Sequence, residues 1–310
     1  MDVVTKAAVL LGAVLIIGAG IASRWFVGAA PVRRERATIV AAAAIGAGLL
    51  VAGSIGEVAV VVTRILRGRF DLELFVDYLG STRQGGAVTL RCALALPLAA
   101  WAAFPLARRP IERVGFASGA VGLLATISWV SHSGTMGTFG FVGDLVHLAA
   151  AASWSGALLA LALMPVWSPG SRLRGLVGGV SQLGLAAVLT LAATGTYMAT
   201  LHMYAPEALT TSAYGRSLLL KLALVGAVLA LAGANRWLFV PLLERFDRSA
   251  PLRASVRVET VLLACVLVAT ALLATRPPAH EAPPTAPQAS TAHTGHASPD
   301  PVDEGDRDGH

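Results

Sequence analysis

Charged residues are scarce in this chain, at 14% of the total, whereas 55% of its residues are hydrophobic. A water-soluble domain of 310 residues could not bury that much apolar surface, so a soluble fold is excluded. Several apolar runs reach the ~20 residues that a helix needs to cross a hydrocarbon core. Lipid offers no partners for backbone amides, and these runs do not alternate as barrel strands do. The sequence therefore predicts an all-α polytopic membrane bundle.

Cysteine and lysine are nearly missing as well. The two cysteines, Cys92 and Cys265, lie singly in apolar runs, which excludes a disulfide framework and a thiolate metal site. Lys6 and Lys221 are the only lysines. The positive charge comes mostly from arginines in short connections, a pattern typical of topology signals. We therefore expect a lipid bilayer around the protein and no nucleic-acid partner.

Enzyme and pump motifs are also absent. The chain has no G-x-x-x-x-G-K-[ST], no H-E-x-x-H and no G-x-S-x-G. These absences argue against ATP-driven pumping, zinc proteolysis and serine hydrolysis within this chain. We expect a protein that is not an enzyme.

Eight spans are predicted from the apolar runs, and they divide the chain into three parts. The first four occupy residues 1–140, the second four occupy 141–275, and a Pro- and His-rich tail at 276–310 is expected to be disordered. The spans are 4–22, 38–63, 87–107, 114–131, 141–164, 176–199, 217–235 and 258–275.

A weak internal sequence similarity relates the two groups of spans. Residues 79–91 resemble residues 209–221, which would suit two parallel four-helix repeats. Chance resemblance between two membrane-entry loops is an equally open explanation.

The distribution of arginine predicts an orientation. An even number of spans puts both termini on one side, and more than half of the basic residues then face the cytoplasm if both termini are extracytoplasmic. Residues 64–86 mix apolar and charged positions, which suits a short helix in the interface.

Histidine and methionine gather at the outer face in this arrangement. The seven histidines are His132, His147, His202, His280, His293, His296 and His310. Met136, Met198 and Met203 lie beside His132 or His202, and Met198 and His202 share a face if their helix continues. Imidazole with thioether suits Cu(I). The pattern predicts a copper site, and the four tail histidines are candidates for metal capture.

His147 is the sharpest candidate because it lies roughly 9 Å inside its span. Asp144 lies three residues earlier and either orients the imidazole or caps the helix. Glu57 lies at a similar depth, and it either faces the same cavity or pairs with an arginine.

Two segments resemble the CopD copper-resistance family. Residues 144–165, DLVHLAAAASWSGALLALALMP, resemble its helix with a histidine followed by W-x-G-G, with Ala157 in place of the second glycine. Residues 214–236 resemble its Y-G-R-x-L-x-x-K helix and the asparagine that follows. The motif positions are His147, Trp154, Gly156, Tyr214, Gly215, Arg216, Lys221 and Asn235.

The resemblance implies an inner-membrane protein of copper uptake or tolerance, working with a periplasmic CopC-like copper-binding protein. It also places Trp154 among the residues that support the site. Two alternatives stay open. One is a b-type haem electron carrier with two of His132, His147 and His202 on the iron, and the other is an assembly factor that delivers copper without translocating it.

Overall fold

The structure is a computed structural model that describes residues 2–26, 33–104, 110–131, 136–165, 167, 171–202, 208–246 and 248–276. All regular structure in this part of the chain is helical. The long helices are α1 (Val3–Ile21), α2 (Arg33–Ile65), α4 (Arg83–Ala103), α5 (Pro110–Ser128), α6 (Gly137–Leu163), α7 (Ser171–His202), α9 (Ala213–Ala234) and α11 (Ala250–Ala274). The short elements are η1 (Ala22–Phe26), α3 (Leu72–Ser81), α8 (Ala208–Thr211), η3 (Asn235–Phe239) and α10 (Val240–Phe246).

The eight predicted spans are confirmed, since eight helices are long and apolar enough to cross a membrane. Most begin several residues before the predicted start, and α11 begins at 250 rather than 258. The reason is that a first helical turn can be polar or basic, so hydropathy places the start too late. The predicted tail from residue 277 onward lies outside the described residues.

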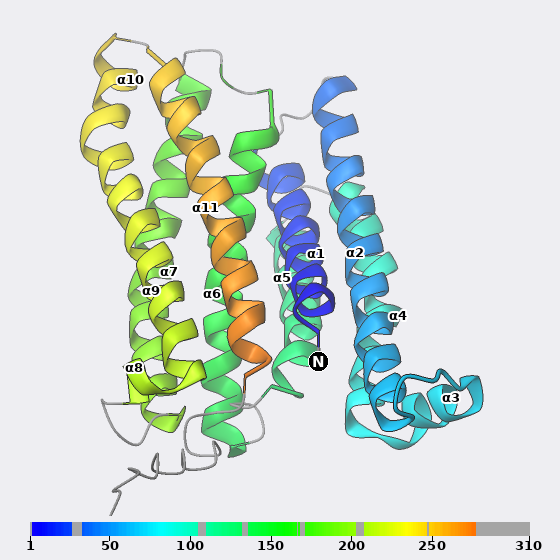
Figure 1. Cartoon of the computed structure of the whole chain (residues 1–310). Helices are drawn as coiled ribbons and strands as arrows, with labels where there is room; N and C mark the ends of the chain where they lie inside the picture. The colour runs from blue at the N-terminus through cyan, green and yellow to red at the C-terminus, as the bar shows by residue number, and fades with distance from the viewer. Residues whose placement is uncertain are drawn as a thin grey trace, which may run out of the picture.

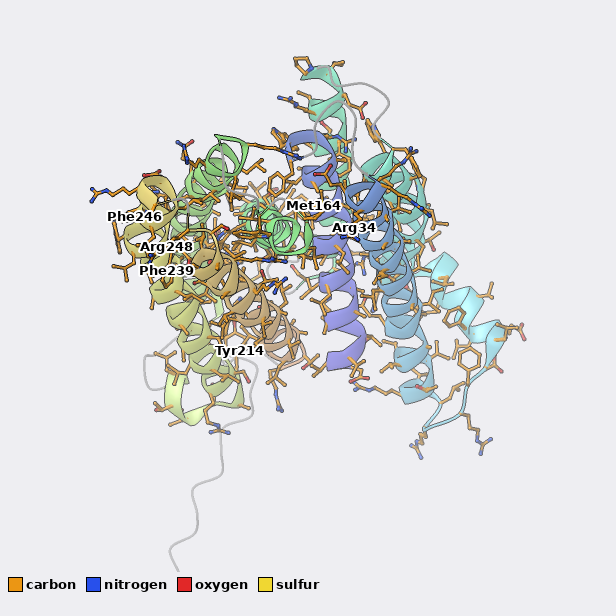
Figure 2. All side chains as sticks on the ribbon, turned by 90° about the horizontal axis from the view of Figure 1, so that it is seen from above. Arg34, Met164, Tyr214, Phe239, Phe246 and Arg248 are labelled. Atoms are coloured by element: carbon orange, nitrogen blue, oxygen red, sulfur yellow. The ribbon has the colours of Figure 1, made fainter. Side chains whose placement is uncertain are left out.

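Helix α1 lies between two groups of helices (Figure 1). It packs against α2 and α4 on one side and against α6 and α11 on the other. The view from above shows the same division, with α1 between the groups (Figure 2). Glycines allow the close contact: a Cβ on Gly18 would lie 2.8 Å from the carbonyl oxygen of Gly156. Gly156, taken from the sequence as a motif position, is therefore the point where α1 and α6 cross.

The start of α1 and the end of α11 lie at the same end of the bundle, which we call the N-terminal face (Figure 1). This agrees with an even number of spans. Helix α3 lies at the same face and confirms the predicted short helix, with Leu72 and Val76 exposed. Its place in a membrane interface stays a prediction.

The two segments that resemble each other begin α4 and α9 with the same cap. Thr82 Oγ1 accepts a hydrogen bond from Gly85 N at 2.9 Å, and Ser212 Oγ accepts one from Gly215 N at 2.8 Å. Each cap satisfies an amide that the first helical turn leaves free. The local likeness of the two segments is therefore structural, whereas the full four-helix repeat stays a prediction.

Candidate metal site

His147 of α6 is held by a threonine of α7. Its Nδ1 lies 2.9 Å from Thr194 Oγ1, and that oxygen lies 2.6 Å from the carbonyl oxygen of Thr190. A hydroxyl has one proton, and Thr194 donates it to its own helix, so Nδ1 must donate to Thr194. The network thus assigns a proton to Nδ1, so in the neutral ring the lone pair lies on Nε2, which is the form that binds metals.

Gly195 leaves space beside this ring. A Cβ at Gly195 would lie 3.5 Å from His147 Cε1, the carbon between the two ring nitrogens. Any longer side chain at 195 would therefore press on the imidazole. The half-buried ring is fixed on one edge by Thr194 and unobstructed by Gly195.

Asp144 and Lys221 lie near His147 without binding its ring in the contacts described. Asp144 Oδ2 accepts a hydrogen bond from Ser131 Oγ at 2.7 Å. Lys221 of α9 interacts electrostatically with both Asp144 and His147. Asp144 is not the cap of α6, because the helix begins at Gly137 and Met136 occupies the cap position without a side-chain bond. Thr194, rather than Asp144, orients the imidazole.

The other predicted ligands lie partly outside the described residues. Helix α7 continues to His202, which places Met198 and His202 at the helical spacing that the sequence analysis required, although the side chain of His202 is not described. Met136 is described and exposed. Outside the described part are His132, Met203, His280, His293, His296 and His310.

No described group of three or more His, Cys, Asp and Glu residues could hold a metal ion. A complete ligand set around His147 must therefore include methionine or residues beyond those described. The haem alternative needs two of His132, His147 and His202, and it stays a prediction because the side chains of His132 and His202 lie outside the described residues.

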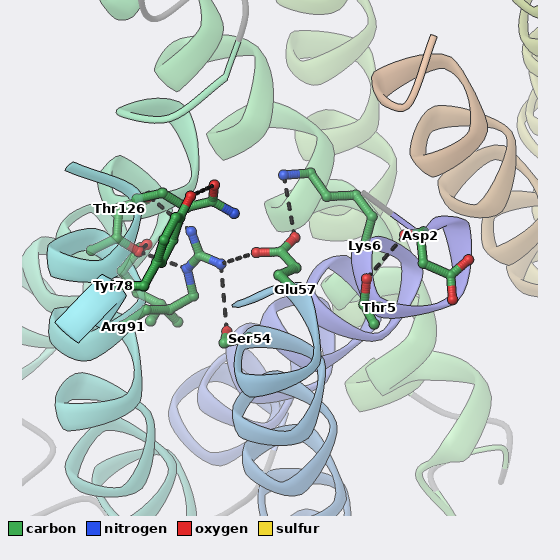
Figure 3. Close-up of polar contacts among 10 residues, drawn as sticks. Asp2, Thr5, Lys6, Ser54, Glu57, Tyr78, Arg91 and Thr126 are labelled. Atoms are coloured by element: carbon green, nitrogen blue, oxygen red, sulfur yellow. Dashed lines mark hydrogen bonds and ion pairs between the residues drawn. The ribbon is translucent and has the colours of Figure 1, made fainter. Parts of the chain in front are cut away.

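Of the two roles considered for Glu57, a place in the cavity of His147 or a pair with an arginine, the structure shows the pair with an arginine. Glu57 Oε2 lies 3.1 Å from Arg91 Nη1, and Glu57 Oε1 lies 3.4 Å from Lys6 Nζ in an ion pair without hydrogen-bond geometry (Figure 3). Arg91 is fully buried and also donates to the side chain and the carbonyl of Thr126. This network joins α1, α2, α4 and α5 close to the N-terminal face, so Glu57 already has two cationic partners.

Two further ion pairs lie toward the opposite face, one buried on both sides and one between a buried glutamate and an exposed arginine. Arg24 Nη2 lies 2.9 Å from Glu112 Oε1, and Arg172 Nη2 lies 3.0 Å from Glu35 Oε1. Sequence reasoning did not find these pairs. Arg24 and Glu35 lie at or near span ends. An arginine at such a place is usually interpreted as a topology signal and not as the partner of a glutamate.

The motif positions divide between packing and polar contacts. Trp154 is buried, with its indole edge against Gly184 of α7. Arg216 donates to the carbonyl of Thr211, which ties α8 to the start of α9. Tyr214 and Lys221 lie on α9, and Asn235 begins the π-helical turn η3.

Known proteins were compared with this chain. The family model of CopD, copper resistance protein D, matches residues 174–273. The match includes Tyr214, Gly215, Arg216, Lys221 and Asn235, whereas the segment 144–165 precedes it. A protein named copper resistance protein D from Pseudomonas syringae pv. tomato is 30% identical over 217 residues, covering 64% of this chain and 66% of the relative. No solved structure matches the chain. The resemblance found in the sequence is confirmed.

Proposed function

We propose, on the premise that residues 174–273 are a CopD copper-resistance domain in a multi-pass membrane protein, that this chain moves copper across the membrane. The observation that carries the proposal is the hydrogen bond from His147 Nδ1 to Thr194, which holds the imidazole inside the bundle and would leave Nε2 of the neutral ring as the metal-binding nitrogen. Thr194 lies within the CopD match, so the residue that orients the proposed ligand belongs to the shared domain.

Copper would reach His147 along α7. Thr194, Met198 and His202 follow one another at intervals of four residues, so their positions form one line from His147 to the end of the helix. Met203 follows this end directly in the sequence, His132 and Met136 precede the first turn of α6, and the tail histidines would gather metal outside. A thioether-rich mouth would favour Cu(I).

Lys221 would keep copper from being trapped. A positive charge near His147 weakens the binding of any cation, and the carboxylate of Asp144 offsets part of that effect. Transport requires binding that is favourable enough for entry and weak enough for release. A lysine that interacts with both an aspartate and a histidine would supply that balance.

Orientation and partner follow from the same proposal. Both termini would be extracytoplasmic in a bacterial inner membrane, copper would move toward the cytoplasm, and a CopC-like periplasmic protein would deliver it. These points rest on the arginine distribution and on the resemblance to the family.

The test is copper uptake into sealed vesicles that contain the purified full chain. We expect His147→Ala to abolish uptake, whereas Val146→Ala, an exposed neighbour on the same helix, keeps it. Uptake by His147→Ala equal to that of the unchanged protein would remove His147 from the pathway. Copper binding without uptake by the unchanged protein would favour the assembly-factor alternative instead.

A further inference from the structure

A second polar site, which does not include His147, lies in a cavity of about 310 Å³ between α6, α7, α9, η3 and α11. Its walls are mostly apolar and include Trp154 and Gly184, with Asn235, Arg236 and Glu259 among the polar residues. Asn235 lies about 21 Å farther along its helix than Lys221, at 1.5 Å per residue. The cavity has room for several water molecules, at about 30 Å³ each.

Glu259 is the acidic residue of this cavity. Its side chain comes from α11, two turns inside the helix, and only 2% of the residue is exposed. Asn235 Nδ2 donates to Glu259 Oε2 at 2.5 Å. The carbonyl oxygen of the same amide, Asn235 Oδ1, is buried and has no partner among the described residues. Asn235 thus fixes the carboxyl group and leaves an acceptor unused beside it.

Glu259 differs from the other buried glutamates of the chain. Glu35, Glu57 and Glu112 each form an ion pair with Arg172, Arg91 or Arg24. Glu259 forms no ion pair with any residue that the structure describes. An ionised carboxylate without a counter-charge is very costly in a low-dielectric interior, so such a group takes up a proton or a cation.

The charged groups near Glu259 do not supply that counter-charge. Arg236 lines the same cavity but is exposed and donates to Ser181 Oγ at 2.8 Å. The helices packed around the cavity carry other titratable groups, and none of those described lines it. These are Lys6 on α1, Arg24 on η1, Asp144 and His147 on α6, Arg172, Arg174 and Tyr197 on α7, Tyr214, Arg216 and Lys221 on α9, Glu244 and Arg245 on α10, and Arg253, Arg257 and Cys265 on α11.

Proton rather than metal suits this donor set. The described polar side chains supply a single carboxylate with amide and hydroxyl oxygens, and soft Cu(I) prefers sulfur and imidazole nitrogen. Divalent hard ions need about six oxygen ligands. Asn235 opens a π-helical turn, an irregularity that is frequent at functional sites.

We propose that Glu259, positioned by Asn235, is a proton-binding site that exchanges its proton with water in the cavity. The carboxylate takes a proton from hydronium and releases water, and the reverse step returns the proton. The site goes beyond copper handling, since none of its groups is a proposed copper ligand. Ionisable groups inside a membrane bundle commonly serve as proton relays.

Carbodiimide labelling of the purified full chain tests the proposal, because dicyclohexylcarbodiimide reacts with protonated carboxyl groups in apolar surroundings. At neutral pH we expect mass spectrometry to find the adduct on Glu259 and not on Glu57 or Glu112, with labelling that falls as the pH is raised. Equal labelling of all three glutamates, or labelling of Glu259 that ignores pH, would overturn the proposal.

Infrared spectroscopy supplies a second measurement that does not depend on reagent access. Glu259→Gln should remove the C=O band of a protonated carboxylic acid, and Glu244→Gln, the same change at an exposed site, should leave it. An unchanged band in Glu259→Gln would also overturn the proposal. Neither measurement uses copper, so failure of copper transport would leave the result standing.

Discussion

The two halves of the bundle handle buried charge in opposite ways. In the half built from α1 to α5, Lys6, Glu57 and Arg91 neutralise one another near the N-terminal face, and Arg24 and Glu112 do so near the other. In the half built from α6 to α11, among the residues that the structure describes, His147 is held through Nδ1 by Thr194 and Glu259 has Asn235 but no ion-pair partner. On the functions proposed above, the first half would be a scaffold and the second half would carry the groups that bind and release a ligand.

The comparison is most direct at the two matching helix starts. Thr82 and Ser212 cap α4 and α9 in the same way, and a basic residue follows at the same distance, Arg91 in one and Lys221 in the other. Arg91 is fully buried against Glu57, whereas Lys221 is half-buried and shared between Asp144 and His147. The same position is thus part of a buried ion-pair network in the first half and lies near the proposed metal ligand in the second.

Breaking the scaffold network should have the largest effect. Arg91→Met leaves Glu57 with Lys6 alone, and loss of one partner of a buried ion pair costs about 3–5 kcal/mol. We expect the free energy of unfolding, measured in mixed micelles with sodium dodecyl sulfate, to fall by that amount. Arg69→Met, at an exposed loop arginine, should leave it unchanged. Equal values for Arg91→Met and the unchanged protein would show that the network does not support the fold.

The proposed metal site should respond in binding rather than in stability. Thr194→Val removes the group that holds the imidazole, and loss of such a partner lowers metal affinity by about 10–100-fold. Copper titration of the purified protein measures the change. Thr190→Val is the matched control, because the hydroxyl of Thr190 bonds its own helix and its carbonyl remains available to Thr194. Equal affinities for the two variants would contradict the role of Thr194.

The contact between the halves offers a smaller test. Gly18→Ala would press a Cβ against the Gly156 backbone, and such overpacking costs typically about 1–3 kcal/mol. Gly48→Ala should stabilise α2 by up to about 1 kcal/mol, because its Cβ meets nothing and alanine favours helix. Thermal unfolding of both variants in detergent gives the comparison. A Gly18→Ala protein as stable as Gly48→Ala would mean that α1 and α6 can separate without cost.

The smallest effect concerns the two caps. Thr82→Ala and Ser212→Ala should each destabilise the protein by about 1 kcal/mol, since each removes one capping bond. Hydrogen exchange at the amides of Gly85 and Gly215 would locate the loss. Similar increases in the exchange rate at both amides would support the structural similarity of the two helix starts. An increase at one amide alone would contradict it.

The sequence was sufficient for the helices but not for their partners. Continuous apolar runs predicted all eight spans, because burial in lipid requires them. The predicted start of a span is too late where the helix begins with a polar turn. For this reason Glu259 was not recognised as a buried residue: the predicted span began at 258, which placed Glu259 at the edge of the membrane. In the structure it lies two turns inside α11.

The environment of His147 shows why contacts escape sequence reasoning. Asp144 is close in the chain and was the natural partner to expect, yet Thr194 of another helix holds the ring. Spacing along one helix predicts which side chains share its face, whereas the rotation of a second helix against it is set by packing of the whole bundle. The pairing of Glu57 with Arg91 was open for the same reason.

The central place of α1 has a consequence for how the molecule comes together. Its buried surface is shared by α2, its neighbour in the chain, and by α6 and α11, which follow much later. During synthesis the side of α1 that carries Gly18 must remain in lipid until α6 has been inserted, and the last neighbour of α1 arrives only with α11. A chain truncated before α11 would leave α1 with an unmatched side, which makes that intermediate a natural target for membrane quality control.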